Sequence, residues 1–274
     1  MSVALVNGIN LYYEVTGKGF PLVWSHEFAG DFKSWDPQVK FFSRRYQVIT
    51  YNARGYPPSD VPLEPTAYSQ EHAIEDLYQL LQHLGIQQAY IGGLSMGGNM
   101  ALNFGIAHPD MVKALIIAAT GSGTTDRENF ESRMEDLARR LETEGMKAAA
   151  ERYVSEPNRV QLPRKDPKSG QEFYEGFVSH SAIGSALTVR GVMLKRPTIF
   201  ALESKLQQLK VPTLIMVGDE DANCIEPSLF MKRNIPRSGL VVFPQAGHAI
   251  NLEEPAIFNR MVLDFLTSVE AGKW

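Results

Sequence analysis

The segment at residues 89–100, AYIGGLSMGGNM, constrains the fold more than any other part of the sequence. An apolar run precedes Ser95, glycines occupy positions 92, 93, 97 and 98, and a helical run of small residues follows. Glycine lacks a Cβ, so glycines gather where the backbone turns sharply or approaches another segment closely. The G-x-S-x-G pattern between a strand and a helix therefore predicts a strained turn that lifts the serine hydroxyl above the carboxyl end of a sheet.

Two nucleotide-binding interpretations of these glycines fail. A phosphate-binding loop needs a lysine after its last glycine, whereas Gly97 is followed by Gly98 and Asn99. The dinucleotide pattern needs three glycines, and the pairs at positions 17 and 19 and at 121 and 123 lack the third.

Continuous apolar runs alternate with helical patterns on both sides of the Ser95 turn. Asn7-Gly8 joins strand-like runs at 3–6 and 9–15 and is typical of a tight hairpin. Residues 69–84 predict a helix that Gly85 ends. Buried strands are predicted within 21–26, 46–52, 88–95, 113–120, 211–222 and 239–248, and a last helix at 255–269. This alternation predicts an α/β fold, with a mostly parallel sheet and helices on both faces.

The strand pattern is interrupted between residues 121 and 205. Thr125-x-x-Glu128 indicates a capping box at the start of a helix, and Met134, Leu137 and Leu141 mark its apolar face. We predict that residues 1–120 and 206–274 form one core and that residues 121–205 form a helical cap inserted into it.

Composition excludes several classes of protein. The 274 residues carry 27 basic and 31 acidic side chains without a basic stripe, so we expect no nucleic-acid partner. A single cysteine, Cys224, excludes an internal disulfide and a cysteine-based zinc site. The sequence shows neither a signal-peptide pattern nor an apolar stretch of bilayer-spanning length, so we expect no membrane partner and a cytoplasmic location.

The Ser95 hydroxyl needs chemical partners to act as a nucleophile. It requires an imidazole within hydrogen-bond reach and a carboxylate that fixes the tautomer of that imidazole. His248 lies in the loop after the last predicted strand, so we predict it as the base. The segment VGDEDANC offers acids at positions 219, 220 and 221 at a strand's carboxyl end, and we choose Asp221 because it lies furthest into the loop.

The order Ser95, Asp221, His248 resembles that of α/β-hydrolase fold serine hydrolases with an inserted helical cap. The motifs SHEFAG, NARGYPPSD, GGLSMGG, VGDED and AGHAINLEEP carry the resemblance, which covers about residues 20–120 and 206–270. In that family the aspartate three places after the strand-end glycine is usually the catalytic acid. Gly218 supplies that glycine here, which agrees with Asp221.

The resemblance also implies an oxyanion hole made by the backbone N–H groups of Phe28 and Met96. The sequence departs from the family's His-Gly-x-x-Gly pattern, because Glu27 stands where the first glycine is expected. A carboxylate beside a developing oxyanion would oppose it. We therefore expect Glu27 to be turned away and bonded to backbone or to a cation; the alternative is a role in the substrate pocket, in contact with substrate or positioning water.

The predicted activity is hydrolysis of a carboxylic ester or lactone of a small, largely apolar substrate, by way of an acyl-enzyme. The mechanism requires no metal and no organic cofactor. The GLSMGG run is similar to those of enol-lactonases, esterases and cofactor-free perhydrolases; carbon–carbon bond hydrolysis and a non-catalytic small-molecule receptor are further alternatives. Residues 190–196 include three cations, Arg190, Lys195 and Arg196. We expect them to be solvated surface residues; the alternative is that they bind an anionic group of the substrate. The sequence predicts no particular oligomeric state.

Overall fold

The computed structural model describes residues 2–274 and begins with the predicted hairpin. Strands β1 (Ser2–Val6) and β2 (Ile9–Thr16) pair antiparallel, with Val6 opposite Ile9. Asn7 and Gly8 have φ angles of 46° and 78°, a region that these two residue types enter at the least steric cost. The hairpin prediction is confirmed.

The hairpin continues into one sheet with the strand order β1-β2-β4-β3-β5-β6-β7-β8. β2 pairs antiparallel with β1 and β4, and every other pair is parallel. The strands after the hairpin are β3 (Phe20–Ser25), β4 (Tyr46–Tyr51), β5 (Ala89–Leu94), β6 (Val112–Ala118), β7 (Thr213–Gly218) and β8 (Ser238–Phe243). Their apolar runs are buried on both faces in the sheet's centre, as expected of parallel strands.

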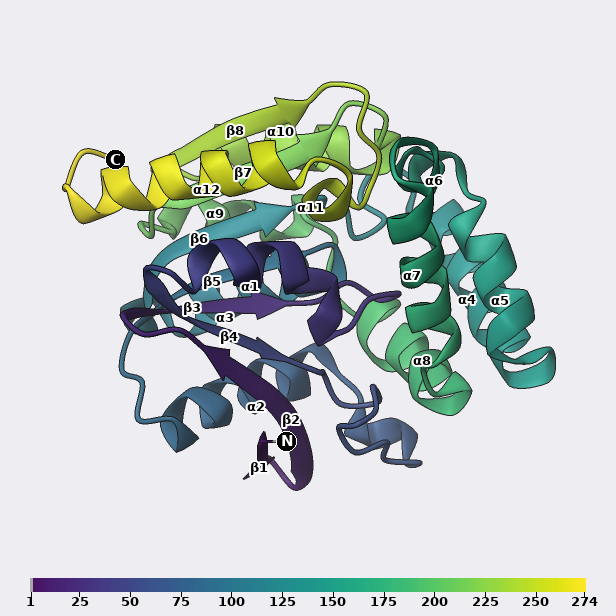
Figure 1. Cartoon of the computed structure of the whole chain (residues 1–274). Helices are drawn as coiled ribbons and strands as arrows, with labels where there is room; N and C mark the ends of the chain where they lie inside the picture. The colour runs from purple at the N-terminus through teal and green to yellow at the C-terminus, as the bar shows by residue number, and fades with distance from the viewer. Residues whose placement is uncertain (1) are drawn as a thin grey trace.

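Helices cover both faces of the sheet (Figure 1). α1 (Asp36–Phe42) and α12 (Pro255–Glu270) lie on one face, where Phe42 and Phe258 pack against Trp24. The other face carries α2 (Gln70–His83), α3 (Met96–Ala107), α9 (Glu203–Gln208) and α10 (Ala222–Asn234). The predicted α/β fold class is confirmed. No helix within residues 2–274 combines the length and apolar character needed to cross a bilayer.

Residues 121–205, called the insertion from here on, connect β6 to β7 through helices. These helices are α4 (Arg127–Thr143), α5 (Gly145–Val154), α6 (Gln161–Lys165), α7 (Pro167–Val178) and α8 (Ala182–Thr188). In Figure 1 they lie beyond the carboxyl ends of the strands. The side chain of Phe28, in the loop after β3, packs against Tyr153 and Phe177 of the insertion with ring centroids 5.8 and 5.7 Å apart.

The predicted start of α4 is wrong by one residue. The cap is Asp126, whose carboxylate accepts the backbone N–H of Asn129 at 3.1 Å, and not Thr125. Aspartate is at least as good an N-cap as threonine and adds a negative charge at the positive end of the helix. The predicted apolar face is correct, because Met134, Leu137 and Leu141 are buried.

Candidate active site

Ser95 stands at the turn between β5 and α3 with a φ of 55° and a ψ of −109°. A non-glycine residue is rarely found there, and such strain is concentrated at functional sites. The surrounding glycines are required sterically: a Cβ on Gly97 would meet the carbonyl oxygen of Ser25, and one on Gly93 would meet the backbone of Gly97. The predicted strained turn is therefore present.

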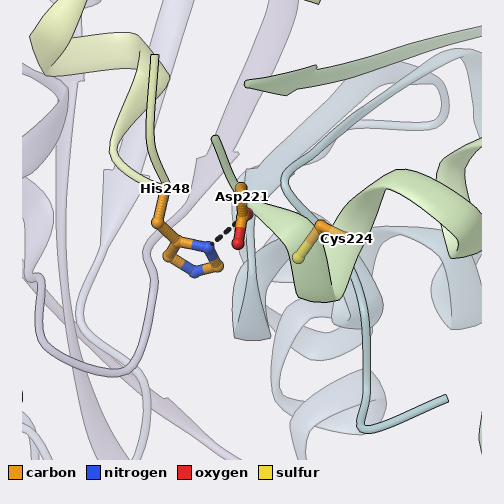
Figure 2. Close-up of side chains that lie close together, drawn as sticks. All are labelled: Asp221, Cys224 and His248. Carbon is orange, nitrogen blue, oxygen red and sulfur yellow. Dashed lines mark hydrogen bonds and ion pairs between the residues drawn. The ribbon is translucent and has the colours of Figure 1, made fainter. Parts of the chain in front are cut away.

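His248 and Asp221 are joined by a hydrogen bond (Figure 2). The Nδ1 of His248 lies 2.6 Å from Oδ2 of Asp221, which is fully buried, whereas Asp219 is exposed. Burial alone would raise the pKa of Asp221, but the charge and hydrogen bond of His248, with hydrogen bonds from Cys224 and Asn158, together hold that pKa below its ordinary value. Asp221 is thus ionised at neutral pH and requires a proton on Nδ1, which leaves Nε2 as the basic nitrogen.

Two further residues support this pair, and neither was predicted from the sequence. Asn158, in the insertion, donates from Nδ2 to Oδ1 of Asp221 at 3.0 Å, and its carbonyl accepts the backbone N–H of His248 at 2.7 Å. The carboxylate of Glu253 accepts the N–H groups of Gly247 and Ala249, on either side of His248. Asn158 precedes Asp221 by 63 residues, so no local sequence pattern predicts the contact.

Ser95, Asp221 and His248 line one cavity of about 90 Å³, between the strand ends and the insertion. A larger hollow of about 1060 Å³ lies at the opposite end of the sheet, beside Gln88, Val112 and Val211. Its lining contains no serine, histidine or cysteine. The smaller cavity is therefore the one that combines a hydroxyl, an imidazole and a carboxylate.

Phe28 and Met96, the predicted oxyanion donors, occupy adjoining segments. Phe28 follows β3, and Met96 is the first residue of α3. The two segments meet at Gly97, where a Cβ would touch the carbonyl oxygen of His26. Within residues 2–274 neither backbone N–H donates a hydrogen bond, and their role as oxyanion donors stays a prediction.

Residues 21–255 match the model of the family described as alpha/beta hydrolase fold. The chain belongs to this alpha/beta hydrolase family. The match spans β3 to the first residue of α12 and includes the insertion.

Individual proteins resemble the chain over nearly its whole length. A putative 2-succinyl-6-hydroxy-2,4-cyclohexadiene-1-carboxylate synthase of Bacillus subtilis is 26% identical, covering 90% of each chain. The crystal structure of an enol-lactonase from Burkholderia xenovorans has a TM-score of 0.86 at 25% identity, covering 97% of this chain and 100% of that one. A thermophilic esterase from Thermogutta terrifontis has a TM-score of 0.86 at 29% identity, covering 98% of each chain.

Glu27, which departs from the alpha/beta hydrolase glycine pattern, pairs with a cation. Its Oε2 accepts a hydrogen bond from Arg159 Nη2 at 2.7 Å, and both side chains are almost fully buried. The same guanidinium nitrogen donates to the hydroxyl of Tyr153, and Cζ of Arg159 lies 4.1 Å from the centroid of that ring. Glu27 does not line the cavity that contains Ser95. The expected bond to a cation is present, and a substrate contact through Glu27 stays a prediction.

The cations at 190–196 differ in their surroundings. Arg190 pairs with Glu135 and Glu142 at the surface, and Lys195 is exposed, as expected. The expectation is wrong for Arg196, whose side chain is only 4% exposed and lines the cavity. Both residues follow a π-helical segment, Val189–Met193, and although they are adjacent, Lys195 is exposed and Arg196 is buried.

Cys224 lies close to Asp221 and His248, as Figure 2 shows, and one ligand atom from each of the three falls within 4.8 Å of the others. The arrangement nevertheless fits proton transfer better than cation binding. His248 Nδ1 and Asp221 Oδ2 are already bonded to each other. Burial, followed by the charge of Asp221, raises the pKa of the Cys224 thiol, and a metal requires the thiolate.

Proposed function

We propose that this alpha/beta hydrolase cleaves a small carboxylic ester or lactone by way of an acyl-enzyme on Ser95, with His248 as general base and Asp221 as the acid of the triad. The observation that carries the proposal is the cavity shared by these three residues, in which the Asp221 carboxylate is bonded to one nitrogen of His248. The enol-lactonase and the esterase among the similar structures support the substrate class.

In the proposed reaction, Ser95 Oγ attacks the carbonyl carbon while His248 Nε2 takes the hydroxyl proton. The imidazolium returns that proton to the leaving oxygen, which yields the alcohol, or opens the ring of a lactone. Water then attacks the acyl-enzyme, again with His248 as base, and releases the acid. Asp221 stabilises the imidazolium at both stages and keeps its ring in one orientation.

The N–H groups of Phe28 and Met96 are the proposed donors to the oxyanion of each tetrahedral intermediate. They are backbone groups, one in the loop after β3 and one at the start of α3. Each such donor is worth about 3 kcal/mol of barrier. The Glu27 carboxylate does not oppose that charge, because Arg159 neutralises it.

The insertion, residues 121–205, acts in this proposal as a cap on the core formed by residues 1–120 and 206–274. Its side chains Phe130, Met134 and Met193 form apolar walls of the cavity. A volume of about 90 Å³ is below the usual 300–1,000 Å³ of ligand pockets, which favours small substrates.

A panel of 4-nitrophenyl esters and simple lactones, hydrolysed by wild type and Ser95→Ala, tests the proposal. We expect multiple turnovers by the wild type, with the highest kcat/KM for short acyl chains, and a loss of at least about a thousandfold in Ser95→Ala. A serine-reactive phosphonate, followed by peptide mass spectrometry, is expected to modify Ser95 alone.

Undiminished turnover in Ser95→Ala, or a label on another residue, would contradict the proposal. Binding of esters by the wild type without turnover would indicate a small-molecule receptor instead.

A further inference from the structure

Arg196 is a buried guanidinium without a counter-charge. Its side chain forms no hydrogen bond or ion pair within residues 2–274, and Nε and Nη1 are both buried without a partner. Buried polar groups are almost always bonded, and buried charges are normally paired. The guanidinium therefore has unmet bonding capacity inside the cavity that it shares with Ser95.

The other buried or half-buried charges of this cavity are already paired. Arg133 bonds to Glu156 at 2.7 Å, and Arg159 bonds to Glu27 at the same distance. Asp126 also lines the cavity, but its carboxylate is exposed and caps α4. Asp221 is bonded to His248. One positive charge, that of Arg196, remains uncompensated.

The surroundings of Arg196 increase the cost of this charge. Burial first, and then the positive charge of Arg127, lower the pKa of Arg196 to about 10. The side chain therefore stays protonated at neutral pH. A buried cation without a partner lowers the stability of the folded protein, and an anionic ligand would offset that cost.

We propose that Arg196 binds a carboxylate of the substrate, so that the preferred substrate is a small ester or lactone that carries a free carboxylate. Arg159 also lines the cavity, and its Nη1, which is buried and without a partner, is a second donor in this proposal. A planar guanidinium matches a carboxylate in shape and charge. The inference rests on the proposed function, because it places this carboxylate in the cavity where Ser95 reacts.

Paired substrates test the inference through activity. Monomethyl glutarate and methyl butyrate present the same kind of ester, with and without a distal carboxylate. We expect the kcat/KM of wild type to be at least about thirtyfold higher for monomethyl glutarate than for methyl butyrate. The reason is that hydrogen bonds between charged groups are stronger than those between neutral groups. Arg196→Met is expected to bring that ratio close to one, and Arg196→Lys to leave an intermediate ratio. Lys195→Met, which changes the exposed neighbouring cation, is the control and is expected to keep the wild-type ratio.

Thermal denaturation tests the same site without catalysis. Glutarate is expected to raise the Tm of Ser95→Ala in a concentration-dependent manner, and to have no effect on the double variant Ser95→Ala/Arg196→Met. Without ligand, the double variant is expected to have the higher Tm, because it lacks the unpaired buried charge.

The outcomes separate the two proposals. Ser95-dependent hydrolysis with equal kcat/KM for the two esters, and no glutarate effect on Tm, would overturn the inference and leave the proposed function intact. Turnover that survives Ser95→Ala would overturn the proposed function, while an Arg196-dependent glutarate effect on Tm would still establish the anion site.

Discussion

Asn158 Nδ2 lies 3.0 Å from Asp221 Oδ1, so a residue of the insertion supports the carboxylate that orients His248. Without this bond, the buried Oδ1 of Asp221 would lose a hydrogen-bond donor. Losing a hydrogen bond to a charged group typically costs about 1.5–3 kcal/mol of stability. We expect Asn158→Ala to lower kcat for a 4-nitrophenyl ester about 10- to 100-fold, with a smaller change in KM.

Asn129→Ala is the matched control, because Asn129 lines the same cavity but its side chain bonds to nothing within residues 2–274. An equal loss in Asn129→Ala would assign the effect to cavity shape and not to the support of Asp221.

The choice of acid is tested by a pair of asparagine substitutions. Asp221→Asn is expected to lower kcat about ten-thousandfold, because an amide stabilises the wrong imidazole tautomer and no imidazolium. Asp219→Asn is expected to change kcat less than threefold: its exposed side chain keeps a carbonyl oxygen to accept the N–H of Ala246. The opposite ranking would move the acid to Asp219.

Asp221 also predicts a dependence of stability on pH. Its pKa is lower in the folded protein than in the unfolded chain, so its ionised form stabilises the fold above the ordinary aspartate pKa of about 3.9. That contribution is expected to fade as pH falls from about 5 through the folded pKa. Urea denaturation of wild type and Asp221→Asn at a series of pH values is expected to show a stability difference that shrinks toward low pH. A difference independent of pH would contradict the lowered pKa.

The strained turn predicts opposite effects for two glycine-to-alanine substitutions. Gly97→Ala brings a Cβ against the carbonyl oxygen of Ser25, and we expect an insoluble protein or a marked fall in Tm. Gly176, inside α7, has open space around it and no positive φ. Gly176→Ala is therefore expected to stabilise by about 0.5–1 kcal/mol, because alanine is the better helix former. Differential scanning calorimetry of both variants checks this, and a tolerated Gly97→Ala would contradict the packing.

The Glu27–Arg159 pair predicts non-additive effects on stability. Glu27→Gln leaves the guanidinium of Arg159 buried without its counter-charge, which typically costs about 3–5 kcal/mol. Adding Arg159→Met is expected to restore part of that loss, as measured by urea denaturation in a double-mutant cycle. Asp264→Asn breaks the exposed Arg260–Asp264 pair and is expected to cost less than about 1 kcal/mol. Additive effects of the two buried substitutions would show that the pair is not coupled.

The sequence predicted the parts of the site that follow regular strands. Ser95, Asp221 and His248 come after β5, β7 and β8, and the carboxyl ends of parallel strands meet at one edge of a sheet. The apolar runs that identify the strands therefore also bring these residues together, although their catalytic roles stay a proposal.

The contributions of the insertion were not predictable in the same way. Asn158 and Arg159 lie in a single 3-10 turn, Pro157–Arg159, too short for any periodicity to show which side chains face the core. Arg196 follows a π-helical segment, where the 3.6-residue spacing used to assign faces fails. For such residues, burial is decided by long-range packing and not by local pattern.

The turn at Pro157–Arg159 limits how far this protein can be recombined with its relatives. Its two polar residues bond to Asp221, in the loop after β7, and to Glu27, in the loop after β3. A chimera that exchanges the insertion to acquire another specificity would discard both contacts at once. A grafted insertion is therefore expected to work only when it keeps Asn158 and Arg159 of this protein. The part of the insertion that can be exchanged is then limited to segments on either side of this turn.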